Sequence, residues 1–296
     1  MYFRGAKRIA KKQLRNVTYN TTFNFMKLVR LLFLILFMSN HVFAKDVADE
    51  NASRKGKVFI YWGYNREWFT KSDIKFTGND YNFTLADVVA KDRQSPFGFD
   101  PYLNPTQISI PQFNFRVGYY FKNNYSISFG IDHMKYVVAQ GQTVKITGTI
   151  NHEGSAYNGE YNNANVVIQP GFLLFEHTNG LNYLNLEVRR IEQAFSYHRF
   201  KMNVTAGIGT GILLPRTDAT LLNIKRHDEF HLAGYGIGGV VGVNIPLYKA
   251  LFIQTEFKEG FINMPDIRTT YEDTDRAHQH FFFSQFNVVL GAMFGL

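Results

Sequence analysis

Apolar and polar residues alternate with a period of two over long segments between residue 57 and the C-terminus. Successive side chains of a β-strand point to opposite faces, so this pattern predicts strands that are apolar on one face only. In the segment 112–121, for example, apolar Phe113, Phe115 and Val117 alternate with Asn114 and Arg116. The alternation predicts eight strands, near 57–68, 110–121, 125–138, 182–193, 200–213, 230–245, 250–263 and 280–296.

The lengths of these segments argue against a soluble β-sandwich. The predicted strands run roughly 10–16 residues, whereas soluble strands usually have about 5–6 and membrane-spanning strands need about 9–11. Short connections alternate with long ones, and aromatic residues gather towards the strand ends, as in Trp62, Tyr64, Tyr119, Phe121, Phe200 and Phe294. We therefore expect an all-β fold, a transmembrane antiparallel up-and-down β-barrel with short periplasmic turns and long extracellular loops.

The long connections contain further strand-like segments at 74–77, 144–149 and 166–175. They are either hairpins that extend the barrel above the membrane or an additional spanning pair. The first interpretation gives eight spanning strands, which we expect, and the second gives ten.

The N-terminal segment holds the whole basic excess of the chain. The formal net charge is +8, but residues 1–44 contain eight Lys or Arg and no Asp or Glu, so the remainder has 32 − 8 = 24 basic and 24 acidic residues. This balance argues against a nucleic-acid partner. Lys27 and Arg30, the apolar run 31–38 and small residues up to Ala44 predict a signal peptide cleaved after Ala44.

Three ranges follow from this reading of the N-terminus. Residues 1–44 are an N-terminal extension plus signal peptide, 45–56 a short periplasmic segment, and 57–296 the barrel. Residues 1–25 are either a long basic region or sequence upstream of a start at Met26. The chain has no cysteine, which excludes disulfides and cysteine metal sites.

The C-terminal hexapeptide carries the most specific local signal. Gly291, Phe294 and Leu296 fit the pattern Gly-x-x-aromatic-x-hydrophobic. This is similar to the assembly signal of small bacterial outer-membrane barrels, although the final residue there is usually Phe. The chain thus resembles the eight-stranded transmembrane barrel class. The resemblance implies location in the bacterial outer membrane, contact with outer-membrane lipid and lipopolysaccharide, and recognition by the barrel-assembly machinery, but no single activity.

The predicted inward face of the barrel carries charges of both signs. An eight-stranded barrel is just wide enough for its own side chains to fill, and buried charges need partners. We therefore expect a network that plugs the lumen, with a small pore as the alternative and no cofactor. Its predicted members are Arg116, Asp132, Glu187, Arg189, Lys201, Glu256 and Lys258.

His177 is the candidate catalytic residue. Outer-membrane phospholipases and lipid A deacylases, which this segment resembles in part, use a His-x-Ser-Asn element in which the histidine activates the serine. Here Thr178 is adjacent and points to the opposite face, and position 179 is asparagine. Asn185 and Glu187 share the parity of His177 and could orient it. A lipid-modifying hydrolase is therefore the second hypothesis, and the sequence favours a protein that is not an enzyme.

His278 and His280 share one strand face and are weak candidates for a metal site, because two ligands without a third are insufficient. The long loops mix charged and aromatic residues, among them Phe76, Phe83, Phe97 and Phe99. This composition suits either recognition of an extracellular ligand or packing of the loops on themselves. A structural or surface-binding role is therefore the first hypothesis.

Overall fold

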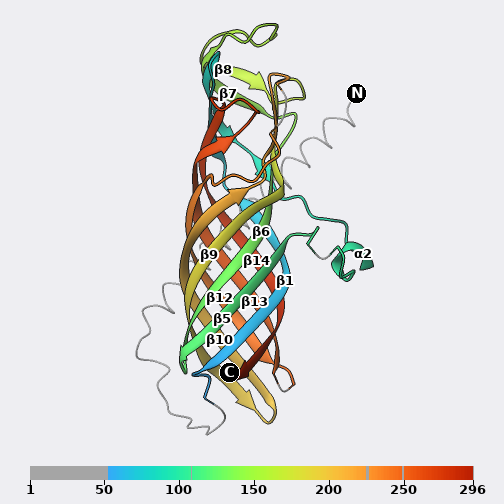
Figure 1. The fold of residues 1–296 in the computed structure, drawn as a ribbon, viewed down its shortest axis with the longest axis vertical. Helices are drawn as coiled ribbons and strands as arrows, with labels where there is room; N and C mark the ends of the chain where they lie inside the picture. Colours follow the sequence, from blue (N-terminus) through green and yellow to red (C-terminus); the bar gives the residue numbers. More distant parts are fainter. Residues whose placement is uncertain (1–52, 108, 225–226, 249, 296) are drawn as a thin grey trace, which may run out of the picture. The chain divides into compact units, whose positions relative to one another are not determined.

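Eight antiparallel strands form a closed ring. The computed structural model describes residues 53–295 except 108, 225–226 and 249. The ring order is β1-β5-β6-β9-β10-β12-β13-β14, and β1 pairs with β14 to close it (Figure 1). The bounds are β1 Lys57–Phe69, β5 Phe113–Lys122, β6 Tyr125–Val138, β9 Leu173–Tyr197, β10 Phe200–Pro215, β12 Gly234–Pro246, β13 Leu251–Arg268 and β14 Arg276–Gly295. The predicted eight-stranded up-and-down barrel is confirmed.

Several predictions concern residues outside the described ranges. The predicted export segment 1–44 lies outside them, as do residues 45–52 of the predicted periplasmic segment and Leu296 of the predicted C-terminal signal. In the parts of the chain that the structure describes, no helix is both long enough and apolar enough to cross a membrane.

Six shorter strands stand at one end of the ring. They are β2 Ser72–Thr77, β3 Tyr81–Val88, β4 Ala90–Lys91, β7 Thr143–Ile150, β8 Gly159–Val167 and β11 Asp218–Leu221. The order β14-β2-β3-β7-β8 continues the sheet from the upper end of β14, while β4 pairs with β6 and β11 with β9. We call these strands, with the upper ends of β6, β9, β13 and β14 against which they pack, the extension.

The extra strand-like segments of the sequence belong to the extension and do not enter the ring. Segment 74–77 falls in β2, and segment 144–149 falls in β7. The prediction of one strand over 166–175 is wrong, because β8 ends at Val167 and β9 begins at Leu173. Pro170, which has no backbone N–H, and Gly171, at a φ of 94°, make the chain turn between them.

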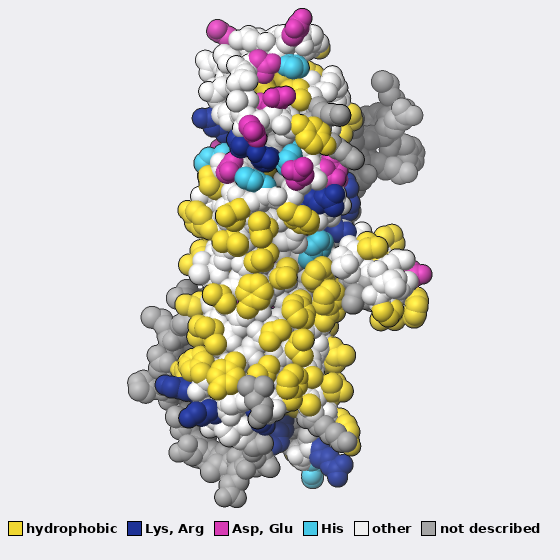
Figure 2. Space-filling model, viewed as in Figure 1, with side chains coloured by type: hydrophobic (Ala, Val, Ile, Leu, Met, Phe, Trp, Pro, Cys, Tyr) yellow, Lys and Arg dark blue, Asp and Glu magenta, His cyan; other side chains and the backbone are white. Residues whose placement is uncertain are grey.

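The barrel strands keep the predicted parity, with apolar side chains outward. Ile60, Phe129, Leu186 and Ile237 are exposed on the outer wall. On the face shown in Figure 2, apolar side chains form a broad belt across the ring, with charged residues above it and at its lower end. Lipid-facing strands require this belt, which is about 25 Å tall in outer-membrane barrels.

The extension has the opposite arrangement. Its interior is a single apolar cluster to which Phe76, Phe83, Phe175 and Ile146 contribute, each fully buried. Phe76 stacks on Phe83 with ring centroids 5.3 Å apart. Phe76 and Phe83 therefore pack the loops on themselves, which was one of the two predicted alternatives for these aromatics.

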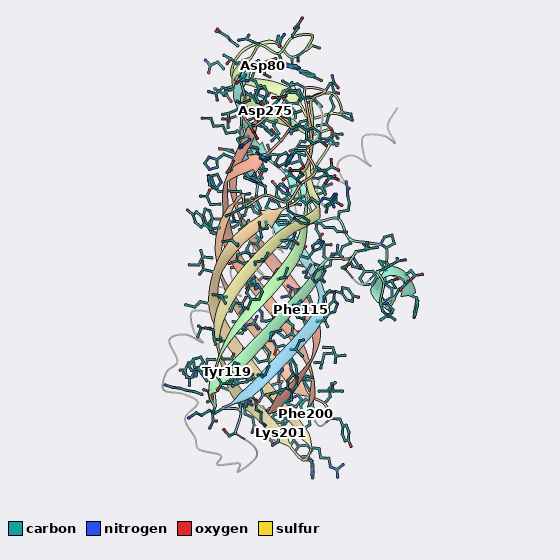
Figure 3. The ribbon with its side chains drawn as sticks, viewed as in Figure 1. Asp80, Phe115, Tyr119, Phe200, Lys201 and Asp275 are labelled. Atoms are coloured by element: carbon teal, nitrogen blue, oxygen red, sulfur yellow. The ribbon has the colours of Figure 1, made fainter. Side chains whose placement is uncertain are left out.

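The two ends of the barrel differ in their connections. Phe200 and Lys201 mark the end with short turns, and Asp80 and Asp275 lie in the extension at the opposite end (Figure 3). β1 begins and β14 ends at the short-turn end. In bacterial outer-membrane barrels short turns face the periplasm and long connections face outward, so we describe the extension as the outer end.

Candidate functional site

Six charged side chains meet inside the barrel, at about the height of Phe115, which Figure 3 labels midway along the ring. Three are basic and three acidic, so their charges cancel. Each is at most 4% exposed. The members are Arg116 on β5, Asp132 on β6, Glu187 and Arg189 on β9, and Glu256 and Lys258 on β13. All six were predicted to face the lumen, and we call them the lumen network.

Glu187 lies at the centre of the lumen network. Its carboxylate accepts from Arg116 at 2.9 Å, from Arg189 at 2.5 Å and from Lys258 at 2.6 Å. Lys258 also contacts Asp132 at 2.5 Å. One carboxylate thus serves three cations, and a buried charge of either sign left alone would be costly.

A second set of contacts crosses the barrel from β9 to β13. Arg189 on β9 pairs with Glu256 on β13. The hydroxyl of Tyr61 on β1 accepts from Arg116 at 3.0 Å and from Arg189 at 3.2 Å, and it donates to Glu256 at 3.1 Å. The sequence placed Tyr61 inward but did not identify it as a member of the network.

Two glycines on β10 make room for this crossing. β10 and β12 lie between β9 and β13 in the ring. A Cβ at Gly207 would meet Arg189, and a Cβ at Gly209 would meet Glu187, at 2.5 Å in each case. Gly207 and Gly209 therefore serve packing, because the long side chains of β9 lie over them.

Lys201 was predicted to belong to the same network, but it lies half-buried at the lower rim. The parity of β10 predicted that its side chain faces inward. Parity carries no information on height, however, and Lys201 is the second residue of β10, next to the turn.

The sequence missed a polar cluster at the upper end of the lumen. Glu67, 3% exposed, accepts from Gln112 and from Gln285, the latter at 3.1 Å. Gln112 also donates to Asp92, whose side chain is 7% exposed. Glu67 shares the parity of Tyr61 on β1, so its inward orientation could have been read from the sequence. Asp92 could not, because it reaches the cluster from a loop.

The structure does not bring the four predicted hydrolase residues together. His177 is fully buried in the extension, where Nδ1 lies 3.0 Å from Oγ1 of Thr217. Thr178 points to the other face and donates to Glu176 at 2.8 Å. Asn185, at 185 − 177 = 8 residues along the same strand, is more than about 20 Å away at the usual strand rise. Asn185 and Glu187 belong to the lumen.

The surroundings of His177 are apolar. Its ring lies against Phe175 and Tyr136, with centroids at 5.2 and 5.7 Å. Burial lowers the pKa of His177 to about 3. Position 177 lies above the spanning part of β9, since the first exposed apolar residue that follows it on the strand is Leu186. A neutral histidine without access to solvent or lipid has the surroundings of a core residue.

The predicted rim histidines are both exposed. The rings of His278 and His280 have centroids 6.4 Å apart on the outer face of β14. Within residues 53–295, apart from the gaps, no group of three or more His, Cys, Asp or Glu side chains is arranged to hold a metal ion.

Gly291 and Phe294 of the C-terminal signal lie in β14. Phe294 is 46% exposed on the outer wall near the periplasmic rim. A Cβ at Gly291 would clash with the ring of Phe252 inside the barrel. Glycine at this position is therefore also required by the packing of Phe252, independently of any role in assembly.

The closed wall, the apolar belt and the polar interior are the properties of a bacterial outer-membrane β-barrel. The chain is accordingly an outer-membrane barrel protein. The six charges of the lumen network lie within the ring, where they neutralise one another.

Comparisons with known proteins find similarity only among solved structures. No family model and no curated protein matches the chain. Among solved structures, OprG of Pseudomonas aeruginosa matches with 8% identity and a TM-score of 0.39, covering 83% of this chain and 99% of its own. The outer-membrane protein AlkL matches with 11% identity and a TM-score of 0.39, covering 88% and 98%. Ail of Yersinia pestis has 9% identity and a TM-score of 0.33, covering 81% and 99%. These values transfer no activity to this chain.

Proposed function

We propose that this protein is a closed outer-membrane barrel that holds a folded β-structured extension at the cell surface, in a structural or surface-binding role. The observation that carries the proposal is the lumen network. Three cations and three anions fill the barrel at mid-height and contact one another directly. Export with cleavage after Ala44 and assembly through the C-terminal signal belong to the same proposal.

A filled lumen leaves the extension as the part that meets other molecules. The extension has an apolar core, and charged groups of this region are visible above the belt in Figure 2. Ordered long connections are often functional. Outer-membrane lipid and lipopolysaccharide are the expected neighbours around the belt, and a ligand would be met by the extension.

Planar-bilayer recording tests the closed lumen. The wild-type protein should give no steady openings. Replacing Arg189 and Glu256 together with alanine removes the side chains that cross the lumen and should produce small channels. Lys122→Ala, at the exposed periplasmic end of β5, is the matched control and should stay silent. Steady openings of the wild type would contradict the proposal.

Labelling of intact cells tests the display of the extension. The chain has no cysteine, so a single introduced thiol is unique. A membrane-impermeant maleimide should react with Glu153→Cys between β7 and β8, but with Lys122→Cys only after the outer membrane is permeabilised. The reverse reactivity would show that the extension faces the periplasm.

The hydrolase hypothesis is tested through His177. The burial of this residue predicts that His177→Ala leaves the phospholipid and lipid A profiles of intact cells unchanged. A changed acylation pattern on deletion of the gene, restored by the wild type and not by His177→Ala, would establish the hydrolase instead.

A further inference from the structure

The connection between β4 and β5 leaves the barrel through its side. β1 pairs with β5 only as far as Tyr64 opposite Phe113, while β1 itself continues to Phe69. Above that point the connection occupies the wall beside β1. In Figure 1 it then carries the short helix α2, Phe99–Tyr102, out to one side of the ring. We call residues 95–103 the foot.

The foot is fastened to the barrel where it departs. Gln94 donates to the carbonyl of Asn65 at 3.0 Å, and Asp92 accepts from the backbone N–H of Glu67 at 3.3 Å. The rings of Tyr64 and Tyr102 meet edge to face at 4.9 Å, and the Tyr64 hydroxyl donates to the Tyr102 carbonyl. These contacts define the height at which the foot leaves the wall.

The foot presents large apolar side chains that nothing in the described chain covers. Phe97 is 96% exposed, Phe99 70% and Leu103 66%. Asp100 is the only charged residue between positions 95 and 103. Exposed aromatic residues grouped in this way mark an interaction surface.

The position of the foot identifies its partner. It departs from Tyr64 on the outer wall, where Trp62 stacks on Phe113 with centroids 4.3 Å apart, and Arg66, with its side chain 64% exposed, is the next outward residue. Figure 2 shows the protruding segment beside the upper part of the apolar belt and below the charged groups. The foot is thus continuous with the lipid-facing surface, at the height where apolar side chains give way to charged ones.

We propose that the foot rests in the outer leaflet of the outer membrane, with Phe97, Phe99 and Leu103 among the acyl chains. Aromatic side chains favour this interface, and segments of this kind are buried only about 5–10 Å into it. Its backbone must stay near the headgroups, because irregular backbone facing lipid is not tolerated in the hydrocarbon. The Leu103 N–H bond to the Phe99 carbonyl, at 2.8 Å, satisfies one turn of the foot internally.

Collisional quenching tests the proposal on the full chain. Phe99→Cys and Leu103→Cys, each carrying an environment-sensitive fluorophore, are folded into phosphatidylcholine vesicles that contain a lipid with a nitroxide near the top of its acyl chain. Phe129→Cys on the belt and Glu153→Cys in the extension are the matched controls. Heat-modifiable migration on gels shows that each variant is folded.

Quenching by the nitroxide lipid should be comparable at positions 99, 103 and 129, and several-fold weaker at 153. Aqueous iodide should give the opposite order. If positions 99 and 103 are quenched by iodide as strongly as 153 and escape the nitroxide lipid, the foot stands in water and the proposal is wrong. Either result is decisive when heat-modifiable migration shows a folded barrel and the label at position 129 is quenched as a lipid-exposed site.

Discussion

The barrel and the extension share strands, but polar and apolar residues occupy opposite faces of these strands in the two regions. On β14, the outward residues change from Phe282 and Phe286 in the barrel to His278 and His280 in the extension. The inward residues change in the opposite sense, from buried Gln285 to buried Phe281. The pairing of β14 with β13 keeps one register from Phe286 to Gln279, and its shift, between Met264 and Ile267, comes only beyond that point. The reversal is therefore in residue type and not in strand geometry, and it follows the change of surroundings from lipid to water.

The two regions consequently hold together in different ways. The extension buries apolar area against itself, as a water-soluble domain does. The outer wall of the barrel faces lipid and gains little from apolar contacts. Its interior combines the paired charges and hydrogen bonds of the lumen network with a smaller apolar cluster that includes Phe59, Tyr120 and Phe252. Changes of one chemical kind should therefore have different effects in the two regions.

The largest effect should come from the centre of the lumen network. Glu187→Gln leaves Arg116, Arg189 and Lys258 with too little buried negative charge, and breaking such a pair typically costs about 3–5 kcal/mol. Urea unfolding of the protein in detergent or vesicles measures this loss. Lys122→Gln, at an exposed strand end, should change the unfolding free energy by less than about 0.5 kcal/mol. An equally small effect of Glu187→Gln would show that the charges do not stabilise the barrel.

The outer faces can be compared on a single strand. Leu186 and Leu174 both point outward from β9 and are 54% and 38% exposed, the first in the belt and the second in the extension. Leu186→Arg should cost about 2–4 kcal/mol near the middle of the membrane. Leu174→Arg should cost less than about 0.5 kcal/mol, because an exposed arginine in water is well tolerated. Similar costs for both would mean that the belt and the extension face the same medium.

The smallest predicted loss of stability depends on pH and is confined to the extension. Burial holds the pKa of His177 at about 3, below its ordinary value of 6.5. The unfolded extension therefore binds a proton that the folded one does not, so stability is full above about pH 6.5 and falls as the pH drops towards 3. The slope approaches about 1.4 kcal/mol per pH unit, or roughly 2–3 kcal/mol between pH 6.5 and 4.5.

Resistance of the extension to proteolysis at pH 7 and at pH 4.5 measures this loss. His177→Leu should abolish most of the pH dependence, and His280→Leu, at an exposed position, should retain it. If the wild-type extension is equally resistant at both pH values, His177 is not the buried neutral group described here.

Much of this organisation could be predicted from the alternation of residues. Parity predicted an inward position for Arg116, Asp132, Glu187, Glu256 and Lys258, because one face of every barrel strand must be apolar for lipid, and the structure has all five buried and paired. The pairing of β3 with β7 and of β2 with β14 could not be predicted, since it joins segments far apart in the sequence. The exchange of polar and apolar faces was present in the alternation of β14, but the residues that precede position 280 were interpreted as a loop.

The candidate site shows the same division. The lumen network depends on parity along regular strands and was therefore predictable. Parity does not give the position of a residue along the barrel axis, so Lys201 was wrongly assigned to the network. The foot and the contribution of Asp92 depend on the path of an irregular connection. A hydrolase at His177 required side chains eight residues apart on one strand to meet, which an extended strand prevents.

A spin-label scan along the outer face of β14 tests the reversal most directly. Single nitroxide labels at 278, 280, 282, 286 and 290 in the reconstituted protein report their access to oxygen, which partitions into lipid, and to a water-soluble nickel chelate. We predict lipid exposure at 282, 286 and 290, aqueous exposure at 278 and 280, and a boundary between 280 and 282. Lipid exposure at 278, or nickel access at 286, would contradict it.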